Sequence, residues 1–505
     1  MLKNQVSDPT ATTALIIKAP PAWVTHARGV AFGLFLIVFT GLYFYIGTHL
    51  IGQTNPNRQK HDQQNNITLA KVAASHMTPE REVGFAGSLW RMFPHHTDGV
   101  VNPLWPWVAA RFYEPGMSDQ EFYVRGKWVN LIITAVFCIL LGLIASRYFS
   151  LLATCNLILL VGFGAMLPRS PYFQPEPLYY IFFFLSWLCC LALLKKNSIW
   201  RYCLLGALAG VAYLAKTSIQ PLLIAFVAVS SYRFLFGALP AIIRKDHNRP
   251  GSEWCWQTHI IGVFFLVVFF LMTAGPRLSY ANERYGSPFH SYPSYWMWLD
   301  DFDSSYQFMG DHQDKSSLRR IPSGEVPSAG NYSKKHSGEQ AVNRLSEGFW
   351  FVSENFVSPK RASEKQPAWR QLLADRGAYL AALLVIIGLF AIWHRFHRPK
   401  AELTVQKLQP EWSSAALFIV GTTIFYALSY GWYLPIGKGD RFMLSLFPPL
   451  VFSLIWAAEG LENRFRARGG NRIPAIAYRV AHLAVFLCIS LRISHLLDNP
   501  EFYGR

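Results

Sequence analysis

The sequence predicts an all-α polytopic membrane protein with about ten or eleven transmembrane helices and two large loops on one side. Of its 505 residues, 52% are hydrophobic and only 15% are charged. Soluble domains carry roughly 25% charged residues. Long apolar stretches recur along the chain, and most could cross a hydrocarbon core of about 30 Å as helices. Aromatic residues make up 15% of the chain, which is typical of helices with ends at a membrane interface.

Eleven apolar segments define the predicted order of the helices. They lie near 29–51, 127–146, 150–167, 177–194, 202–215, 219–237, 258–275, 377–393, 413–433, 442–459 and 478–496. Several are short, so one or two are expected to be re-entrant or half-spanning. The first is interpreted as an anchor, because no small-residue cleavage site follows it.

The distribution of basic residues predicts the orientation. Twenty Lys or Arg residues fall in the segments assigned to the cytosol, and four fall in the three short loops assigned to the outside. The cytosolic segments are 1–28, the turn near 147, 195–201, 233–257, 394–412 and 460–479. Basic loops stay in the cytosol. This bias accounts for the net charge of +17, and we expect no nucleic-acid partner because no recognition motif accompanies the charge.

These assignments divide the chain into four parts. Residues 1–28 form a cytosolic tail, and 29–275 form an N-terminal membrane module with a first outer loop at 52–126. Residues 276–376 form a second large outer loop, expected to be flexible where it is rich in Ser, Gly and charge. Residues 377–505 are the C-terminal membrane helices. The sequence has no CxxC pair, so neither a disulfide framework nor a zinc site is expected.

Ionisable residues beside the predicted helix ends are the first functional candidates, because a charge close to the hydrocarbon core is costly. Asp62 follows the first helix and could act as a general base. A solvated loop aspartate is the alternative. Glu176 opens the fourth apolar segment between two prolines, where a helix N-terminus favours an anion. A helix-start carboxylate without a further role is the alternative. We expect both carboxylates to face one cavity.

Two cations occupy short outer turns. Lys216 follows the fifth apolar segment, and Arg441 precedes the tenth. Such cations suit a phosphate at the level of the lipid headgroups. Interfacial side chains that extend toward water are the alternative.

Metal binding has weaker support. Asp301 and Asp303 form a DxD motif, which binds a metal in soluble nucleotide-sugar transferases through a Rossmann-like domain that is not predicted here. A divalent ion held by oxygen ligands, at these residues or at Asp62 and Glu176, stays open beside the alternative of solvated carboxylates. No cofactor is certain. The chain has no Walker A loop, GxSxG elbow or HExxH pair, so nothing supports an ATPase, an α/β-hydrolase or a zinc protease.

Several local motifs follow one another in a characteristic order. They are His61-Asp62, the helical stretch 68–77, Asn102-Pro103-Leu104-Trp105-Pro106-Trp107, Gln174-Pro175-Glu176-Pro177, the Gly-rich 206–216, the 276–288 stretch and Asp440-Arg441-Phe442. This order resembles the GT-C superfamily of glycosyltransferases, which use polyprenyl-phosphate sugars and include protein O-mannosyltransferases and lipid A aminoarabinose transferases. The similarity in the order of helices and loops covers most of the chain. The similarity in amino-acid sequence is confined to short local motifs.

The resemblance implies an inverting sugar transfer from a polyprenyl-phosphate donor in the membrane lipid to a glycan, lipid or protein acceptor. It assigns Asp62 as catalytic base and Glu176 as a second acidic site residue, although many members carry an acidic pair where Asp62 stands alone. The candidates for binding the donor phosphate are Lys216, Arg441, Arg277 and Arg91. The expected location is a bacterial inner membrane, with the active site in the periplasm.

Two other functions stay open. An O-antigen ligase or polymerase also uses polyprenyl donors, but typically through cationic essential residues. A secondary transporter or lipid flippase would hold ionisable residues at the bilayer midplane. The candidates here cluster at helix ends instead, which favours a transferase.

Overall fold

The computed structural model describes residues 22–53, 62–77, 93–238, 256–357, 376–396, 410–437, 440–467 and 473–498. All regular elements in these ranges are helices. Eight helical segments of the described chain are long and apolar enough to cross a membrane: His26–Gln53, Asp119–Ala145, Glu176–Lys195, Thr217–Phe236, Gln257–Tyr285, Ser413–Trp432, Arg441–Asn463 and Ala475–Ser494. The prediction of a polytopic α-helical membrane protein is therefore confirmed at this level.

Three further apolar helices are shorter. They are Leu151–Met166, Ile199–Ala215 and Arg376–Leu389. Each coincides with one of the remaining predicted segments, so all eleven apolar segments are helical.

Two predicted boundaries are wrong. The second long helix begins at Asp119 rather than at 127, because Ser118 and Glu121 form a capping box there. The helix predicted to end at 275 continues to Tyr285.

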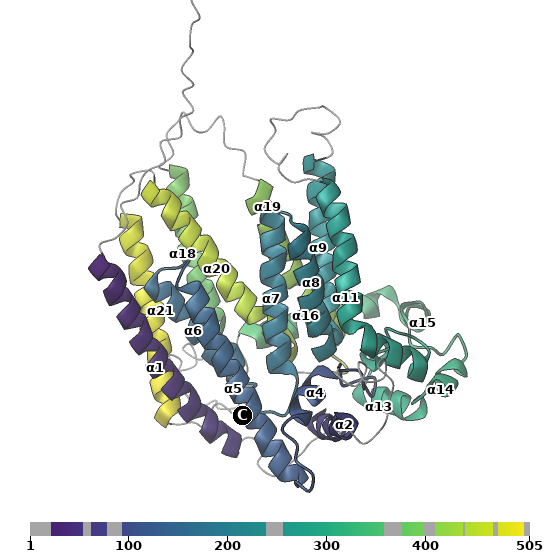
Figure 1. Ribbon diagram of the computed structural model, residues 1–505. Coiled ribbons are helices and arrows are strands. Elements are labelled where there is room, and N and C mark those ends of the chain that lie inside the picture. Colours follow the sequence, from purple (N-terminus) through teal and green to yellow (C-terminus); the bar gives the residue numbers. More distant parts are fainter. Residues whose placement is uncertain are drawn as a thin grey trace, which may run out of the picture.

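The bundle contains two groups of packed helices (Figure 1). One group comprises α1 (Ala22–Gln53), α5 (Asp119–Ala145), α6 (Leu151–Val161), α18 (Arg376–Phe396), α20 (Phe447–Ala467) and α21 (Ile473–Asp498). The other comprises α7 (Glu176–Lys195), α8 (Ile199–Ala215), α9 (Gln220–Arg233), α11 (Trp256–Tyr285) and α19 (Pro410–Trp432). Helix α7 joins them, because it contacts α5 and α20 as well as α8 and α19.

Small residues allow one close helix contact in the second group. Gly206 and Gly210 of α8 face α11. A Cβ at Gly206 would collide with the backbone carbonyl of Leu266, and a Cβ at Gly210 would lie 2.6 Å from the Thr273 Cβ. Glycine at such positions lets helices in a membrane approach closely. This packing fixes the end of α8, from which Lys216 follows.

The outer surface of the bundle carries large exposed apolar side chains. Ile37 of α1 is 70% exposed, and Met272 of α11 is 68% exposed. Further exposed apolar residues lie on α18 and α21, including Leu389 and Leu491. A soluble protein seldom exposes such continuous apolar helix faces. They are the surface expected of helices embedded in lipid.

Shorter helices gather at one end of the bundle, at the bottom and lower right of Figure 1. They are α2 (Asp62–Met77), α4 (Leu104–Ala110), α12 (Tyr292–Trp296), α13 (Phe302–Asp311), α14 (Lys315–Arg319) and α15 (Ala329–Lys335). Helix α16 (Gly338–Val357) follows and packs against α19. The segment expected to be flexible thus contains several short helices between its loops.

Short non-α helical turns complete the described elements. They are η1 (Gly162–Met166), η2 (Thr217–Ile219), η3 (Phe234–Ala238) and η5 (Asp440–Leu446). Two of them, η2 and η5, contribute backbone to the cavity described next. The α-helices are interrupted at these two points, so side chains there can point into that cavity.

Candidate functional site

A cavity of about 730 Å³ lies between the short helices and the ends of the long ones. Its wall comes from segments far apart in the sequence: the start of α2, residues 100–102, the start of α7, residues 215–221, α12 and α13, and the end of α19 with the following turn. Asp62, Glu176, Lys216 and Arg441 all line it. The expectation that Asp62 and Glu176 face one cavity is confirmed.

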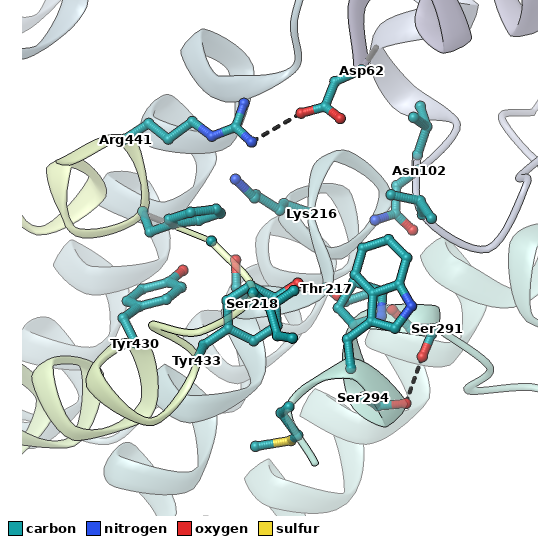
Figure 2. A pocket seen from close by; sticks show the side chains of 18 of the residues that line it. Asp62, Asn102, Lys216, Thr217, Ser218, Ser291, Ser294, Tyr430, Tyr433 and Arg441 are labelled. Atoms are coloured by element: carbon teal, nitrogen blue, oxygen red, sulfur yellow. Dashed lines mark hydrogen bonds and ion pairs between the residues drawn. The ribbon is translucent and has the colours of Figure 1, made fainter. Parts of the chain in front are cut away.

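Asp62 forms an ion pair with Arg441. The Arg441 guanidinium lies 2.9 Å from the Asp62 carboxylate, and each side chain is about one-third exposed to the cavity (Figure 2). Asp62 is the first residue of α2, where the helix N-terminus favours a negative charge. The Tyr180 hydroxyl donates a hydrogen bond of 2.6 Å to the Arg441 carbonyl. This bond from α7 anchors the turn that carries the cation.

Glu176 forms the second pair, with Lys216. The Lys216 ammonium donates to the Glu176 carboxylate at 3.2 Å. Glu176 is only 3% exposed and begins α7, with Pro177 in the first turn. Lys216 stands at the break between α8 and η2, where its extended backbone turns the side chain into the cavity. Burial lowers the pKa of the Lys216 ammonium, and the neighbouring Glu176 carboxylate opposes that shift.

The two pairs belong to one electrostatic cluster. Glu176 interacts with Arg441 and Arg169 as well as with Lys216. The Phe442 ring contacts both cations that line the cavity, 4.8 Å from the Lys216 nitrogen and 5.0 Å from the Arg441 guanidinium carbon. Cations outnumber carboxylates among these five charged groups. Arginine and lysine suit phosphate oxygens.

Aromatic side chains form the other walls. Trp296, Tyr306, Tyr430 and Tyr433 line the cavity from α12, α13 and the end of α19. Burial raises the pKa of the Tyr306 and Tyr433 phenols, so both stay protonated at neutral pH. They can donate hydrogen bonds while their rings pack against a ligand. The site thus combines charged and aromatic side chains around one cavity.

Some predicted residues lie away from this cavity. Arg277 is 1% exposed and donates hydrogen bonds to the Tyr213 hydroxyl and to the carbonyls of Pro288 and His290. It anchors the segment after α11 and does not line the cavity. Arg91 falls outside the described residues.

The DxD carboxylates also lie apart from the charged cluster. Asp301 caps α13 by accepting from the Ser304 amide at 2.7 Å, and Asp303 is exposed in the first turn of that helix. Neither residue lines the cavity. Within the described ranges, no three His, Cys, Asp or Glu side chains gather in a way that could hold a metal ion.

Other cavity residues were not identified from the sequence. Asn66 lies one turn after Asp62 on α2, and Asn102 precedes α4. The position of Asn66 at i+4 from a candidate base is a signal that sequence inspection could have used. The contribution of Trp296 depends on the path of residues 286–300, which hydropathy does not predict.

Fold and site together define an integral membrane protein with a charged, aromatic-walled cavity at one end of its helical bundle. The chain matches no protein-family model, and a comparison with curated proteins finds no match. Its function is therefore argued from the chemistry of the cavity.

Proposed function

We propose that this chain is a membrane glycosyltransferase of the GT-C type, which moves a sugar from a polyprenyl-phosphate donor to an acceptor hydroxyl. The observation that carries the proposal is the meeting of Asp62, Arg441, Glu176 and Lys216 in one cavity at the ends of membrane helices. A lipid-phosphate donor needs its phosphate near the headgroups and its sugar just beyond. The cavity offers cations for the phosphate and aromatic side chains for the sugar.

The proposed reaction is a single displacement. Asp62 takes the proton of the acceptor hydroxyl, whose oxygen attacks the anomeric carbon of the sugar. The new carbon–oxygen bond forms as the bond from that carbon to the phosphate oxygen breaks. The electron pair leaves with the phosphate, so polyprenyl phosphate departs with one additional negative charge. Arg441 and Lys216 stabilise that charge.

The ion pairs suit this sequence of events. In the described state Arg441 is bound to Asp62 at 2.9 Å. A donor phosphate would compete with Asp62 for the guanidinium and release the carboxylate toward the acceptor. Lys216 is held by Glu176 at 3.2 Å, which offsets part of the cost of burying the ammonium group. Glu176 thus acts as a positioning residue for one phosphate-binding cation.

The orientation of the chain follows the charge distribution described above. The proposed location of the cavity is therefore the side opposite the basic loops, in the periplasm of a bacterial inner membrane. The donor is a partner carried by the membrane lipid, and the acceptor can be a glycan, a lipid or a protein. The chemistry proposed here requires no nucleotide.

The test is sugar transfer in proteoliposomes from radiolabelled polyprenyl-phosphate hexoses and pentoses. Wild type, Asp62→Asn and Asp311→Asn are compared; Asp311 is an exposed residue at the end of α13, outside the cavity. Transfer by wild type and Asp311→Asn alone supports both the class and the base. Transfer by all three retains the class and rejects Asp62 as the catalytic base. A ligase that relies on cationic residues would give the same result. No transfer from any donor rejects the transferase and favours a transporter.

A further inference from the structure

Besides its charged residues, the cavity contains buried polar atoms that lack a hydrogen-bond partner among the described residues. Four of them are the side-chain oxygens Asn66 Oδ1, Asn102 Oδ1 and Glu176 Oε2, and the indole nitrogen Trp296 Nε1. The four side chains are 1%, 5%, 3% and 5% exposed, respectively. Buried polar groups in folded proteins are almost always paired. Such a set around one cavity indicates a ligand that supplies the partners.

The orientation of the Asn66 amide is set by a hydrogen bond within the protein. Its Nδ2 donates to the Asp62 carbonyl at 2.5 Å, so Oδ1 is left as an acceptor. In Glu176, Oε1 accepts from Lys216, which leaves Oε2 as an acceptor. Two of the unpartnered atoms are therefore firm acceptors, and the indole nitrogen of Trp296 can only donate.

The unpartnered atoms surround the cavity. Asn66 belongs to α2, Asn102 to the segment before α4, Glu176 to the start of α7, and Trp296 to α12. Figure 2 shows Asn102 on the same side of the cavity as Asp62, with Lys216 and Arg441 farther across. A ligand that meets all of these atoms must present several polar groups around a compact body.

The charged residues around the cavity further restrict the kind of ligand that it can bind. An ammonium group would lie among Lys216, Arg441 and Arg169, whose charges act on Glu176. A carboxylate on the ligand would face acceptor oxygens without a proton to donate. Uncharged hydroxyl groups can donate to Asn66 and Glu176 and accept from Trp296. Aromatic side chains such as Tyr306 and Tyr433 provide flat apolar surface for the carbon–hydrogen faces of a sugar ring.

We propose that Asn66, Asn102, Glu176 and Trp296 recognise the hydroxyl groups of a neutral sugar, which makes this the sugar carried by the donor. This inference rests on the proposed function and specifies its substrate class. A site built to hydrogen-bond a hydroxyl discriminates strongly against an analogue that lacks it, because its buried polar atoms then stay unpaired. Asn66, Asn102 and Trp296 are accordingly specificity-determining residues.

The test measures binding separately from transfer. Dissociation constants are measured for purified full-length protein in nanodiscs with polyprenyl-phosphate mannose, polyprenyl-phosphate glucose and sugar-free polyprenyl phosphate. Wild type should bind at least one hexose lipid about ten-fold or more tightly than the sugar-free lipid, which corresponds to one good added hydrogen bond or more. Equal binding of all three lipids, or no binding of any, overturns the inference.

Substitutions in the cavity test which residues are responsible for the tighter binding of the hexose lipid. Asn66→Ala and Asn102→Ala should each weaken binding of the hexose lipid about ten-fold and leave the sugar-free lipid unaffected. Asn355→Ala is the matched control, because Asn355 also donates to a carbonyl one helical turn earlier, that of Phe351, and lies outside the cavity. Equal weakening of both lipids by the cavity variants, or no weakening of either, contradicts the assignment.

A second measurement needs no variant and so does not depend on folding. Hexose lipids with one hydroxyl replaced by fluorine keep their size but lose a hydrogen-bond donor. Wild type should bind at least one of them about ten-fold more weakly than the parent lipid. Undiminished binding of the whole fluorinated series overturns the inference. Hydroxyl-dependent binding without transfer rejects the proposed reaction alone, and transfer that is indifferent to these hydroxyls rejects this inference alone.

Discussion

Asp62 and Arg441 are separated by most of the chain, yet the carboxylate and the guanidinium lie 2.9 Å apart. The pair joins the first short helix after α1 to the turn that opens α20. It therefore couples the candidate base to a candidate phosphate ligand. A donor that binds Arg441 must alter the environment of Asp62.

The first prediction concerns that arginine. Arg441→Gln should lower kcat/KM for a polyprenyl-phosphate sugar by about 10- to 100-fold, because a hydrogen bond to a charged group is worth roughly 1.5–3 kcal/mol. The pair with Asp62 is partly exposed, so the free energy of unfolding should change by no more than about 1 kcal/mol. Transfer kinetics and unfolding in mixed micelles measure the two effects. Arg320→Gln, which changes an exposed arginine at the end of α14, is the control; equal activity of both variants would remove Arg441 from the site.

The second prediction concerns the buried pair. Lys216→Gln should destabilise the protein by about 3–5 kcal/mol, because it leaves the Glu176 carboxylate buried without its direct partner. Glu176→Gln should have a smaller effect, since Lys216 is more exposed. The double variant should be more stable than Lys216→Gln, which is the signature of direct coupling. Additive losses in unfolding titrations of the three variants would show that the pair is not coupled.

The third prediction separates Arg277 from the phosphate ligands. Arg277→Leu should destabilise the fold by roughly 3 kcal/mol or more, because it removes two hydrogen bonds to carbonyls and one to a phenol. The KM for the donor should remain unchanged in the protein that folds. Donor titrations at a temperature below the unfolding midpoint provide the measurement. A raised KM with wild-type stability would return Arg277 to the donor site.

The fourth prediction is a pH dependence of stability. Burial, reinforced by the charge of Arg277, lowers the pKa of His290 from its usual value of 6.5 to about 4. Between these two values the unfolded chain binds the proton and the folded chain does not, so stability falls as the pH drops from 6.5 to 4. Burial also lowers the pKa of His96 to about 4, which adds to the same trend.

Thermal midpoints from pH 7 to pH 4 test this contribution. His290→Phe, which preserves the ring stacked 4.1 Å from Tyr285, should reduce the slope over that range. His49→Phe changes an exposed histidine of α1 and should leave the slope as it is in wild type. Identical slopes for all three proteins would show that His290 does not set the acid sensitivity.

The helices could be predicted because hydropathy is a local property of the chain. Each of the eleven apolar segments is helical, and eight are long enough to span a bilayer. The two misplaced ends have separate causes. A capping box at Ser118 starts α5 early, and α11 continues past the apolar stretch to Tyr285 and contacts α14.

The site was predictable only in part. Asp62, Glu176, Lys216 and Arg441 stood out because each is a charge beside an apolar segment, and all four line the cavity. Which cation meets which carboxylate depends on tertiary packing, and no sequence spacing encodes it. Arg277 is also a charge beside an apolar segment, but it donates hydrogen bonds to backbone carbonyls and does not line the cavity. Asn66 offered only its i+4 spacing from Asp62, and Asn102 was one residue of a longer motif, because an uncharged amide in a polar segment carries little information until it is buried.

The most direct test of the proposed reaction is the stereochemistry of a single turnover. A polyprenyl-phosphate hexose of known anomeric configuration is mixed with excess enzyme and acceptor, and the product is analysed by NMR. We expect an inverted anomeric centre in wild type and a rate at least about 100-fold lower in Asp62→Asn, the lower end of general-base catalysis. Retention of configuration, or a wild-type rate in Asp62→Asn, would contradict a single displacement with Asp62 as base.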